Sequence, residues 1–213
     1  MNLARQAFLH LVARPLAVLF TGADVVGREH LPTAGPAIIA ANHNSHVDTL
    51  LLLTMFPPRL LPLLRPAAAA DYFLKGPLIG WFSRTVVGIV PVQRTLAGSG
   101  ADVLAPMREA LAAGDIVILF PEGTRGDASD EMGELKSGIA RLAHDTPHAP
   151  VIPVWIEGAG RVLPKGAGIP VPMNCTVLIG EPLAWTGERL SFMAALRERL
   201  MALKAQAPPQ HWS

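Results

Sequence analysis

The sequence predicts an α/β fold in which helices flank a mixed, largely buried β-sheet. Two observations lead to this prediction. Short runs rich in β-branched residues alternate with longer segments of helical character, and half of the 213 residues are hydrophobic. No repeat or linker divides the chain, and its length suits one domain with a single core. We expect an N-terminal helix over residues 1–22 and a single domain over residues 23–213.

The expected elements follow from apolar runs and from the residues that bound them. Strands are predicted at 23–27, 36–41, 60–64, 88–92, 115–120, 151–156 and 175–180. Helices are predicted at 4–13, 46–56, 77–86, 99–113, 138–144 and 187–205. The helix at 99–113 has the best-defined ends, with Ser99 as a candidate N-cap and Gly114 as its stop. The polar segment Arg125–Lys136 is expected to be a loop.

The amino-terminal segment predicts an interfacial helix rather than a signal peptide. Arg14 and Pro15 interrupt the apolar stretch over residues 4–20, and no clean small-residue cleavage site follows. No uncharged apolar run in the chain approaches the roughly 18 to 20 residues needed to span a bilayer. We therefore expect an amphipathic helix on a membrane surface. Its apolar side is expected to carry Leu3, Ala7, Phe8 and Leu11.

Charge is unevenly distributed along the chain, although the net charge is only +1. Residues 1–94 hold eight Lys or Arg against four Asp or Glu, and residues 95–213 hold ten against thirteen. Four arginines lie beside the most apolar segments, where each could gain about 1 kcal/mol from an anionic lipid surface. They are Arg5, Arg14, Arg59 and Arg65. The alternative is that they solvate an ordinary protein surface.

The cysteine content bears on the cellular compartment. Cys175 is the single cysteine, so the chain can form no internal disulfide. This fits a reducing setting, and we expect the cytoplasmic face of the cell membrane. Cys175 itself is expected to be a small buried apolar residue.

The first polar motif, NHNSHVD over residues 42–48, follows a predicted strand at the edge where an open α/β sheet binds ligands. The run Ser45–Asp48 has the form of a capping box with Ser45 as N-cap. His43 then precedes the helix and Asp48 lies in its first turn. The carboxylate can hold one imidazole nitrogen and leave the other as a general base. The alternative is that Asp48 only caps the helix and His43 is an ordinary loop histidine.

Two other chemistries fit the same residues less well. Metal-dependent hydrolases of the β-lactamase type use a His-x-His-x-Asp-His run, of which His46 and Asp48 form the middle. Asn44 and Thr49 stand at the flanking ligand positions, and no cysteine cluster offers another site, so no metal is expected. A serine hydrolase would need a Gly-x-Ser-x-Gly elbow, which the sequence lacks.

The second motif, FPEGTR over residues 120–125, predicts an anion-binding turn after a buried strand. Proline ends the strand, and Gly123 lets the backbone turn with its amides exposed. Arg125 can grip a phosphate with two parallel hydrogen bonds, and Lys136 adds a cation near a helix amino terminus. Arg94, which follows the strand at 88–92, is a weaker signal of the same kind. The alternative is a solvated surface turn.

In this order, the motifs resemble those of the glycerolipid acyltransferase family, of the 1-acyl-glycerol-3-phosphate acyltransferase type. Its four blocks are matched by His43-x4-Asp48, Gly88–Arg94, Phe120–Arg125 and Val151–Val154. The similarity extends to residues 27–32 and 180–183, so it covers nearly the whole chain. Two departures bear on the identity of the acceptor: Gln93 stands where the second block usually has an acidic residue, and residues 67–70 lack a frequent lysine.

The resemblance implies that residues 23–213 form an acyltransferase domain in which His43 deprotonates the acceptor hydroxyl and Asp48 orients His43. The hydroxyl would attack the thioester of acyl-CoA or an acyl-carrier protein, giving phosphatidic acid without a cofactor. The residues implied to bind the acceptor phosphate are Arg94, Glu122, Gly123, Thr124, Arg125 and Lys136. The expected partners are the acyl donor and membrane lipids, not nucleic acid. Two alternatives stay open: acylation of another lysolipid, such as a lyso-ornithine lipid, and a non-catalytic, membrane-associated lipid-binding protein.

Overall fold

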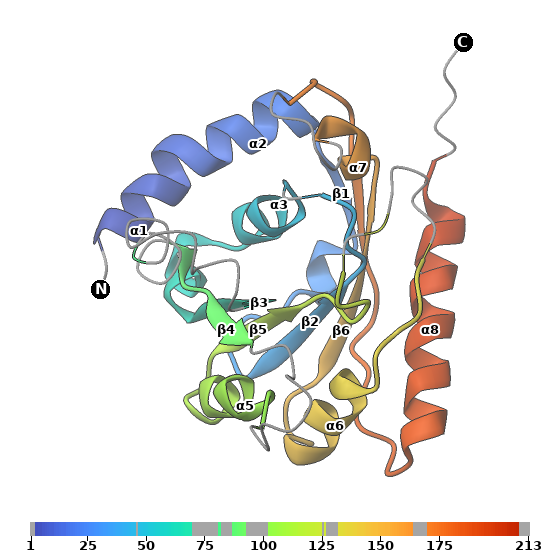
Figure 1. Cartoon of the computed structure of the whole chain (residues 1–213). Helices are drawn as coiled ribbons and strands as arrows, with labels where there is room; N and C mark the ends of the chain where they lie inside the picture. The colour runs from blue at the N-terminus through green and yellow to red at the C-terminus, as the bar shows by residue number, and fades with distance from the viewer. Residues whose placement is uncertain are drawn as a thin grey trace.

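A β-sheet lies between two layers of helices in the computed structural model of the chain (Figure 1). The structure describes residues 3–45, 47–69, 81, 87–92, 102–124, 126, 132–163 and 170–208. None of the described helices combines the length and the apolar character needed to cross a membrane.

The strands and helices have the following bounds. The strands are β1 (Asp24–Val26), β2 (Ala37–Ala41), β3 (Leu64–Ala69), β4 (Val90–Val92), β5 (Ile116–Leu119), β6 (Val151–Glu157) and β7 (Thr176–Ile179). The α-helices are α1 (Leu3–Phe8), α2 (Arg14–Thr21), α3 (Val47–Met55), α5 (Ala105–Ala112), α6 (Gly138–Asp145), α7 (Ala159–Val162) and α8 (Arg189–Gln206). A π-helical turn η1 (Leu9–Ala13) joins α1 to α2, and η2 (Arg28–His30) and η3 (Pro58–Leu63) are 3-10 helices.

The sheet is mixed and has the strand order β1-β7-β6-β2-β5-β3-β4. The antiparallel pair is β6 with β7, and the other neighbouring strands run parallel. Both faces are covered, as a largely parallel sheet requires. In β2, Ala37, Ile39 and Ala41 pack toward α3 and α7, whereas Ile38 and Ala40 pack toward α5, α6 and α8. The predicted fold class is therefore confirmed.

One predicted strand is wrong. The segment expected at 60–64 forms η3 up to Leu63, and β3 begins only at Leu64. The leucines and prolines of this run carry no alternation that separates a strand from a short helix. Pro58 also fixes a backbone angle that suits a helical turn. The other predicted strands are found with ends that differ by at most two residues, and Cys175 is buried as expected.

One predicted helix begins later than expected, and another falls outside the described residues. The helix expected from residue 99 begins at Ala105. Asp102 closes the preceding turn because its Oδ1 accepts the Leu104 N–H at 3.1 Å. Ser99 and, apart from Trp81, the helix expected at 77–86 lie outside the described residues. Gly114 ends α5 as predicted, in a left-handed conformation with φ of 81°. Helix α7 was not predicted.

The N-terminal helix continues to Thr21, within the segment expected over residues 1–22 but beyond the shorter helix predicted at 4–13. In the π-helical turn η1, Arg14 N–H donates to Leu9 O, which widens the helix directly before Pro15. A wider turn accommodates a proline ring that would clash with the carbonyl of a regular α-helix. The buried stripe recurs every four residues: Arg5, Leu9, Ala13, Ala17 and Thr21.

The two sides of this helix have different surroundings, and both are apolar. The side opposite the buried stripe exposes Leu11, Val12, Leu16, Val18 and Leu19. Arg14 is exposed on the same helix. Arg5 is only 5% exposed, so the expectation that it lies on the outer surface of this helix is wrong. The hydrophobic pattern of residues 4–20 gave the wrong orientation for Arg5, because a helix with apolar residues on both sides does not indicate which side faces the core.

Substitution of Leu9 tests whether the N-terminal helix contributes to the stability of the core. Its side chain is 3% exposed and packs in the same cluster as α3. We expect Leu9→Ala to lower the free energy of unfolding by about 2–5 kcal/mol. Leu11→Ala, on the same helix but 75% exposed, should change it by less than about 0.5 kcal/mol. Chemical denaturation measures both, and equal losses would contradict this packing.

Candidate active site

The two polar motifs meet at the carboxyl ends of β2 and β5, which are neighbouring parallel strands in the sheet. After β2 the chain passes to α3 on one face, and after β5 it passes to α6 on the other. Connections that diverge in this way leave a crevice at the edge of the sheet, where α/β proteins bind ligands. This topology brings residues that are far apart in the sequence into one site.

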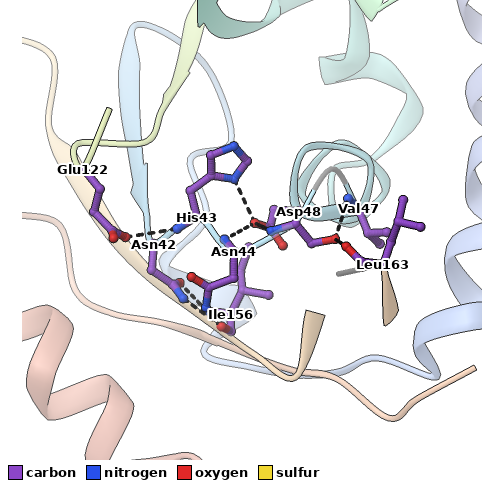
Figure 2. A network of polar contacts seen from close by, with 9 residues as sticks. Asn42, His43, Asn44, Val47, Asp48, Glu122, Ile156 and Leu163 are labelled. Carbon is purple, nitrogen blue, oxygen red and sulfur yellow. Dashed lines mark hydrogen bonds and ion pairs between the residues drawn. The ribbon is translucent and has the colours of Figure 1, made fainter. Parts of the chain in front are cut away.

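His43 and Asp48 form the centre of the site. His43 Nδ1 lies 2.9 Å from Asp48 Oδ2 (Figure 2). An ionised carboxylate only accepts hydrogen bonds, so Nδ1 carries the proton and Nε2 holds a free lone pair. Nε2 has no hydrogen-bond partner among the described residues. The Asp48 side chain is buried and that of His43 is 19% exposed, so the imidazole is the accessible member of the pair.

The start of α3 fixes this geometry locally. Asp48 Oδ2 also accepts the backbone N–H groups of Asn44 and Ser45, each at 2.8 Å. In return, Ser45 Oγ accepts the Val47 N–H at 3.3 Å. The bond from Ser45 N–H to Asp48 is one half of the predicted capping box, whereas the serine hydroxyl accepts the amide of Val47 rather than that of Asp48. The same carboxylate oxygen therefore begins the helix and holds the imidazole.

Glu122 connects the second motif to the backbone of His43. Its Oε1 accepts the His43 N–H at 3.1 Å, and its Oε2 accepts the Gly133 N–H at 3.0 Å. A Cβ atom at Gly133 would lie 2.9 Å from Oε2, so glycine permits this approach. The Gly126 N–H donates to His43 O at 2.8 Å. Both backbone polar groups of His43 are thus held by the segment that follows β5.

Three further contacts support the pair of His43 and Asp48, and none of them was predicted from the sequence. The Phe120 ring stacks on the His43 imidazole, with centroids 4.0 Å apart and planes inclined by 18°. The Asn42 side chain bonds to both backbone groups of Ile156, at 2.7 and 2.8 Å, and so joins the end of β2 to β6 (Figure 2). Ser45 Oγ donates to the Leu163 carbonyl at 3.1 Å. A buried asparagine directly after an apolar strand was the available signal.

The turn after Phe120 contains the other residues predicted to bind phosphate. Gly123 has a φ of 72°, and its N–H donates to Phe120 O at 3.0 Å. Gly123 and Thr124 are exposed. Lys136 N–H donates to Pro121 O at 2.8 Å, and its Cγ would lie 3.6 Å from a Cβ atom at Gly123, so Lys136 lies beside the turn. Arg94 and Arg125 lie outside the described residues.

The chemistry of the described residues is that of an oriented base. His43 Nε2 can accept a proton from a hydroxyl group, and Asp48 stabilises the imidazolium that results. Within the described ranges, no three His, Cys, Asp or Glu side chains gather as ligands for a metal ion. Asp48 Oδ2 and both oxygens of Glu122 already accept protein N–H groups.

Known acyltransferases are similar to this chain over most of its length. The chloroplastic 1-acyl-sn-glycerol-3-phosphate acyltransferase LPAT1 of Arabidopsis thaliana is 31% identical over 185 residues, which cover 84% of this chain and 49% of that protein. The 1-acyl-sn-glycerol-3-phosphate acyltransferase of Pseudomonas aeruginosa is 29% identical over 180 residues, covering 84% of this chain and 66% of that protein. The chain spans about half the length of the plant relatives that it matches.

A solved structure has the same fold. The crystal structure of the 1-acyl-sn-glycerophosphate (LPA) acyltransferase PlsC from Thermotoga maritima matches with a TM-score of 0.78 and 24% sequence identity. The match covers 98% of this chain and 81% of that one. A family model described as Acyltransferase matches residues 22–157, which contain both polar motifs and the strands β1 to β6. The chain therefore belongs to the acyltransferase family.

Proposed function

We propose that the protein transfers a fatty acyl group from an acyl thioester to the free hydroxyl of 1-acyl-glycerol-3-phosphate, giving phosphatidic acid. The observation that carries this proposal is the pair of His43 and Asp48, in which Nδ1 is held at 2.9 Å and Nε2 is free for a substrate hydroxyl. The names of the relatives support this acceptor, because they are called 1-acyl-sn-glycerol-3-phosphate acyltransferases. The donor is acyl-CoA or an acyl-carrier protein.

The proposed reaction requires one base and no covalent acyl-enzyme. His43 Nε2 takes the proton of the acceptor hydroxyl as its oxygen attacks the thioester carbonyl. The tetrahedral intermediate then expels the thiolate, which receives the proton from the imidazolium. Asp48 keeps Nδ1 protonated and stabilises the positive charge on His43 between these steps. Because a thioester is already activated, the direct attack suffices.

We assign the phosphate of the acceptor to the turn that follows Phe120. Gly123 and Thr124 are exposed there, and Lys136 lies beside them. Arg125 follows in the sequence, and Arg94 comes two residues after the end of β4, so both belong to the same proposed site. Guanidinium and ammonium groups beside an exposed turn suit a phosphate.

We assign a different role to Glu122. Its two oxygens bond to backbone N–H groups, and a carboxylate would repel a phosphate. Glu122 is therefore a positioning residue that holds the backbone of His43, and it shapes the phosphate site only indirectly.

The acceptor is a lipid, so the enzyme must work at a membrane surface. The exposed apolar side of the N-terminal helix suits the boundary between head groups and acyl chains. We propose that this side lies in the interface of the cytoplasmic leaflet. Arg14 is exposed on the same helix and can meet anionic head groups.

The direct test of the function is an acceptor panel. Purified protein is incubated with radiolabelled acyl-CoA or acyl-carrier protein and with lysophosphatidate, lysophosphatidylcholine or a lyso-ornithine lipid. Labelled phosphatidic acid as the main product supports the proposal. Preference for another lysolipid would overturn the acceptor, and no product with any pair would favour a lipid-binding protein without turnover.

The proposed roles of His43 and Asp48 can be tested by substitution. We expect His43→Ala to lower kcat by about 10²–10⁴-fold or more, because the general base is removed. Asp48→Asn should also lower it by orders of magnitude and weaken the start of α3 by about 1 kcal/mol. The control is His144→Ala, on the exposed side of α6. Folded His43→Ala protein with normal turnover would exclude this mechanism.

Glu122 can be distinguished from the phosphate ligands by kinetics. In Glu122→Gln the amide retains one acceptor oxygen, which leaves the N–H of His43 or of Gly133 unpaired. We expect kcat to fall about 10–100-fold with little change in the acceptor KM. Lys136→Ala should instead raise the acceptor KM. Glu198→Gln, which changes an exposed carboxylate on α8, is the control. A rise confined to the acceptor KM in Glu122→Gln would place this residue on the substrate.

Membrane binding is best tested by substitution rather than deletion, because removing residues 1–20 would also remove Leu9 and Ala13 from the core. We expect the double variant Leu16→Ser and Leu19→Ser to bind anionic vesicles at least about tenfold more weakly, since it withdraws two apolar side chains from the interface. Val26→Ser, at an exposed apolar position on β1, is the control. Sedimentation measures both. Equal binding by the two proteins would contradict the proposed surface.

A further inference from the structure

A cavity lies at the edge of the sheet formed by β3 and β4. Strand β4 pairs with β3 only from Ala67 onward, so the edge of β3 before that residue is not covered by β4. A cavity of about 510 Å³ occupies this notch. Its lining includes Arg5 and Gln6 from α1, Arg65 from β3 and the backbone around Gly88. Arg5, Gln6 and Arg65 are thus the polar side chains of an otherwise mainly apolar lining, and the proposed acyl transfer uses none of them.

The notch is separate from the catalytic pair. Arg65 Nε bonds to Asp115 Oδ2 at 2.7 Å, and Asp115 directly precedes β5. Phe120, which stacks on His43, follows the other end of the same strand. The five residue steps between them span about 16 Å at about 3.3 Å each. No residue of the described catalytic site lines the cavity.

Arg65 has unused hydrogen-bonding capacity. Its ion pair with Asp115 uses only Nε, and neither Nη group has a partner among the described residues. The side chain is 30% exposed and lines the cavity. A guanidinium presents its two Nη groups in a planar fork that matches the oxygens of a phosphate.

Arg5 places a second cation beside the first. Its Nη2 donates to Leu64 O at 2.7 Å, on the uncovered edge of β3. Burial and the charge of Arg65 lower the pKa of Arg5 to about 10, and Asp115 opposes this shift. Arg5 is still charged at neutral pH. Arg5 and Arg65 place two positive charges beside the cavity, which favours the binding of an anion there.

Gly88 explains how Arg5 reaches this position. Its φ is 75°, and a Cβ atom there would lie 2.6 Å from Arg5 Nη1. A side chain at this position would push the guanidinium away from the sheet edge. The glycine that opens the second sequence block therefore makes room for Arg5.

We propose that this notch binds a phosphate-bearing anion, with Arg65 as its main ligand and Arg5 as a second cation. The anion is inorganic phosphate or the phosphate of a lipid head group, since both present the same oxygens. Gln6 adds an amide that can donate to it. Such binding does not depend on acyl transfer.

The first experiment titrates inorganic phosphate into the full-length protein by calorimetry at constant ionic strength. Every variant also carries Arg125→Ala, which removes a proposed contact with the acceptor phosphate. We expect Arg65→Gln to weaken binding about tenfold, as loss of a charge-assisted hydrogen bond would. Arg59→Gln, an equal charge change at an exposed position, should leave binding unchanged.

A substitution at Asp115, the ion-pair partner of Arg65, tests whether Arg65 binds the phosphate or has only a structural role. Asp115→Asn removes the carboxylate that competes for Arg65, so it should strengthen phosphate binding. If Arg65→Gln does not fold, Arg65→Lys keeps the charge, loses the fork and should bind with intermediate affinity. Weaker binding in Asp115→Asn, or equal binding in folded Arg65 and Arg59 variants, would overturn the proposal for inorganic phosphate.

The second experiment identifies the source of the phosphate. Vesicles of phosphatidylcholine with and without phosphatidylglycerol are sedimented with the same proteins. A loss of phosphatidylglycerol-dependent binding in Arg65→Gln but not in Arg59→Gln supports a lipid head group. Phosphate binding that needs Arg65, with vesicle binding unchanged, supports the free anion. If neither probe distinguishes the two variants, the proposal is wrong.

Discussion

A single carboxylate oxygen, Asp48 Oδ2, holds the candidate active site together. It accepts the Nδ1 proton of His43 and the N–H groups of Asn44 and Ser45, all within 2.9 Å. A buried carboxylate is costly unless it is hydrogen-bonded, and donors of this kind stabilise its charged form. Its place in the first turn of α3 adds the favourable end of the helix dipole. Initiation of the helix and orientation of His43 therefore depend on the same oxygen, so a change at Asp48 disturbs both.

The second constraint acts through the backbone of His43 and depends on strand order. Glu122 is 79 residues from His43 in the sequence, yet its Oε1 accepts the His43 N–H because β2 and β5 are adjacent. The parallel pairing aligns the carboxyl ends of the two strands, so the turn after β5 faces the loop after β2. The imidazole is fixed from the helix side by Asp48 and from the sheet side by Glu122 and Phe120.

Local structure that depends on residues close together in the sequence could be predicted. Contacts that depend on how distant segments pack could not. The spacing of Ser45 and Asp48 indicated a capping box because both partners lie within one turn. The hydrogen bond from the His43 N–H to Glu122 was not predicted because it depends on which strands are neighbours. The start of β3 was missed because its apolar run has no periodicity. Burial of Arg5 was missed because it requires a hydrogen bond to Leu64 across the fold.

The N-terminal helix connects the fold to the proposed membrane surface. Its buried stripe includes Ala13 and Ala17, whose small side chains permit close approach, and α2 packs directly on α3. Helix α3 carries Asp48 in its first turn and so determines where His43 lies. The outer, apolar side of the N-terminal helix is thus fixed relative to His43 through the packing of α2 and η1 on α3. Under the proposed function, this packing sets the direction from which a lipid acceptor would approach Nε2.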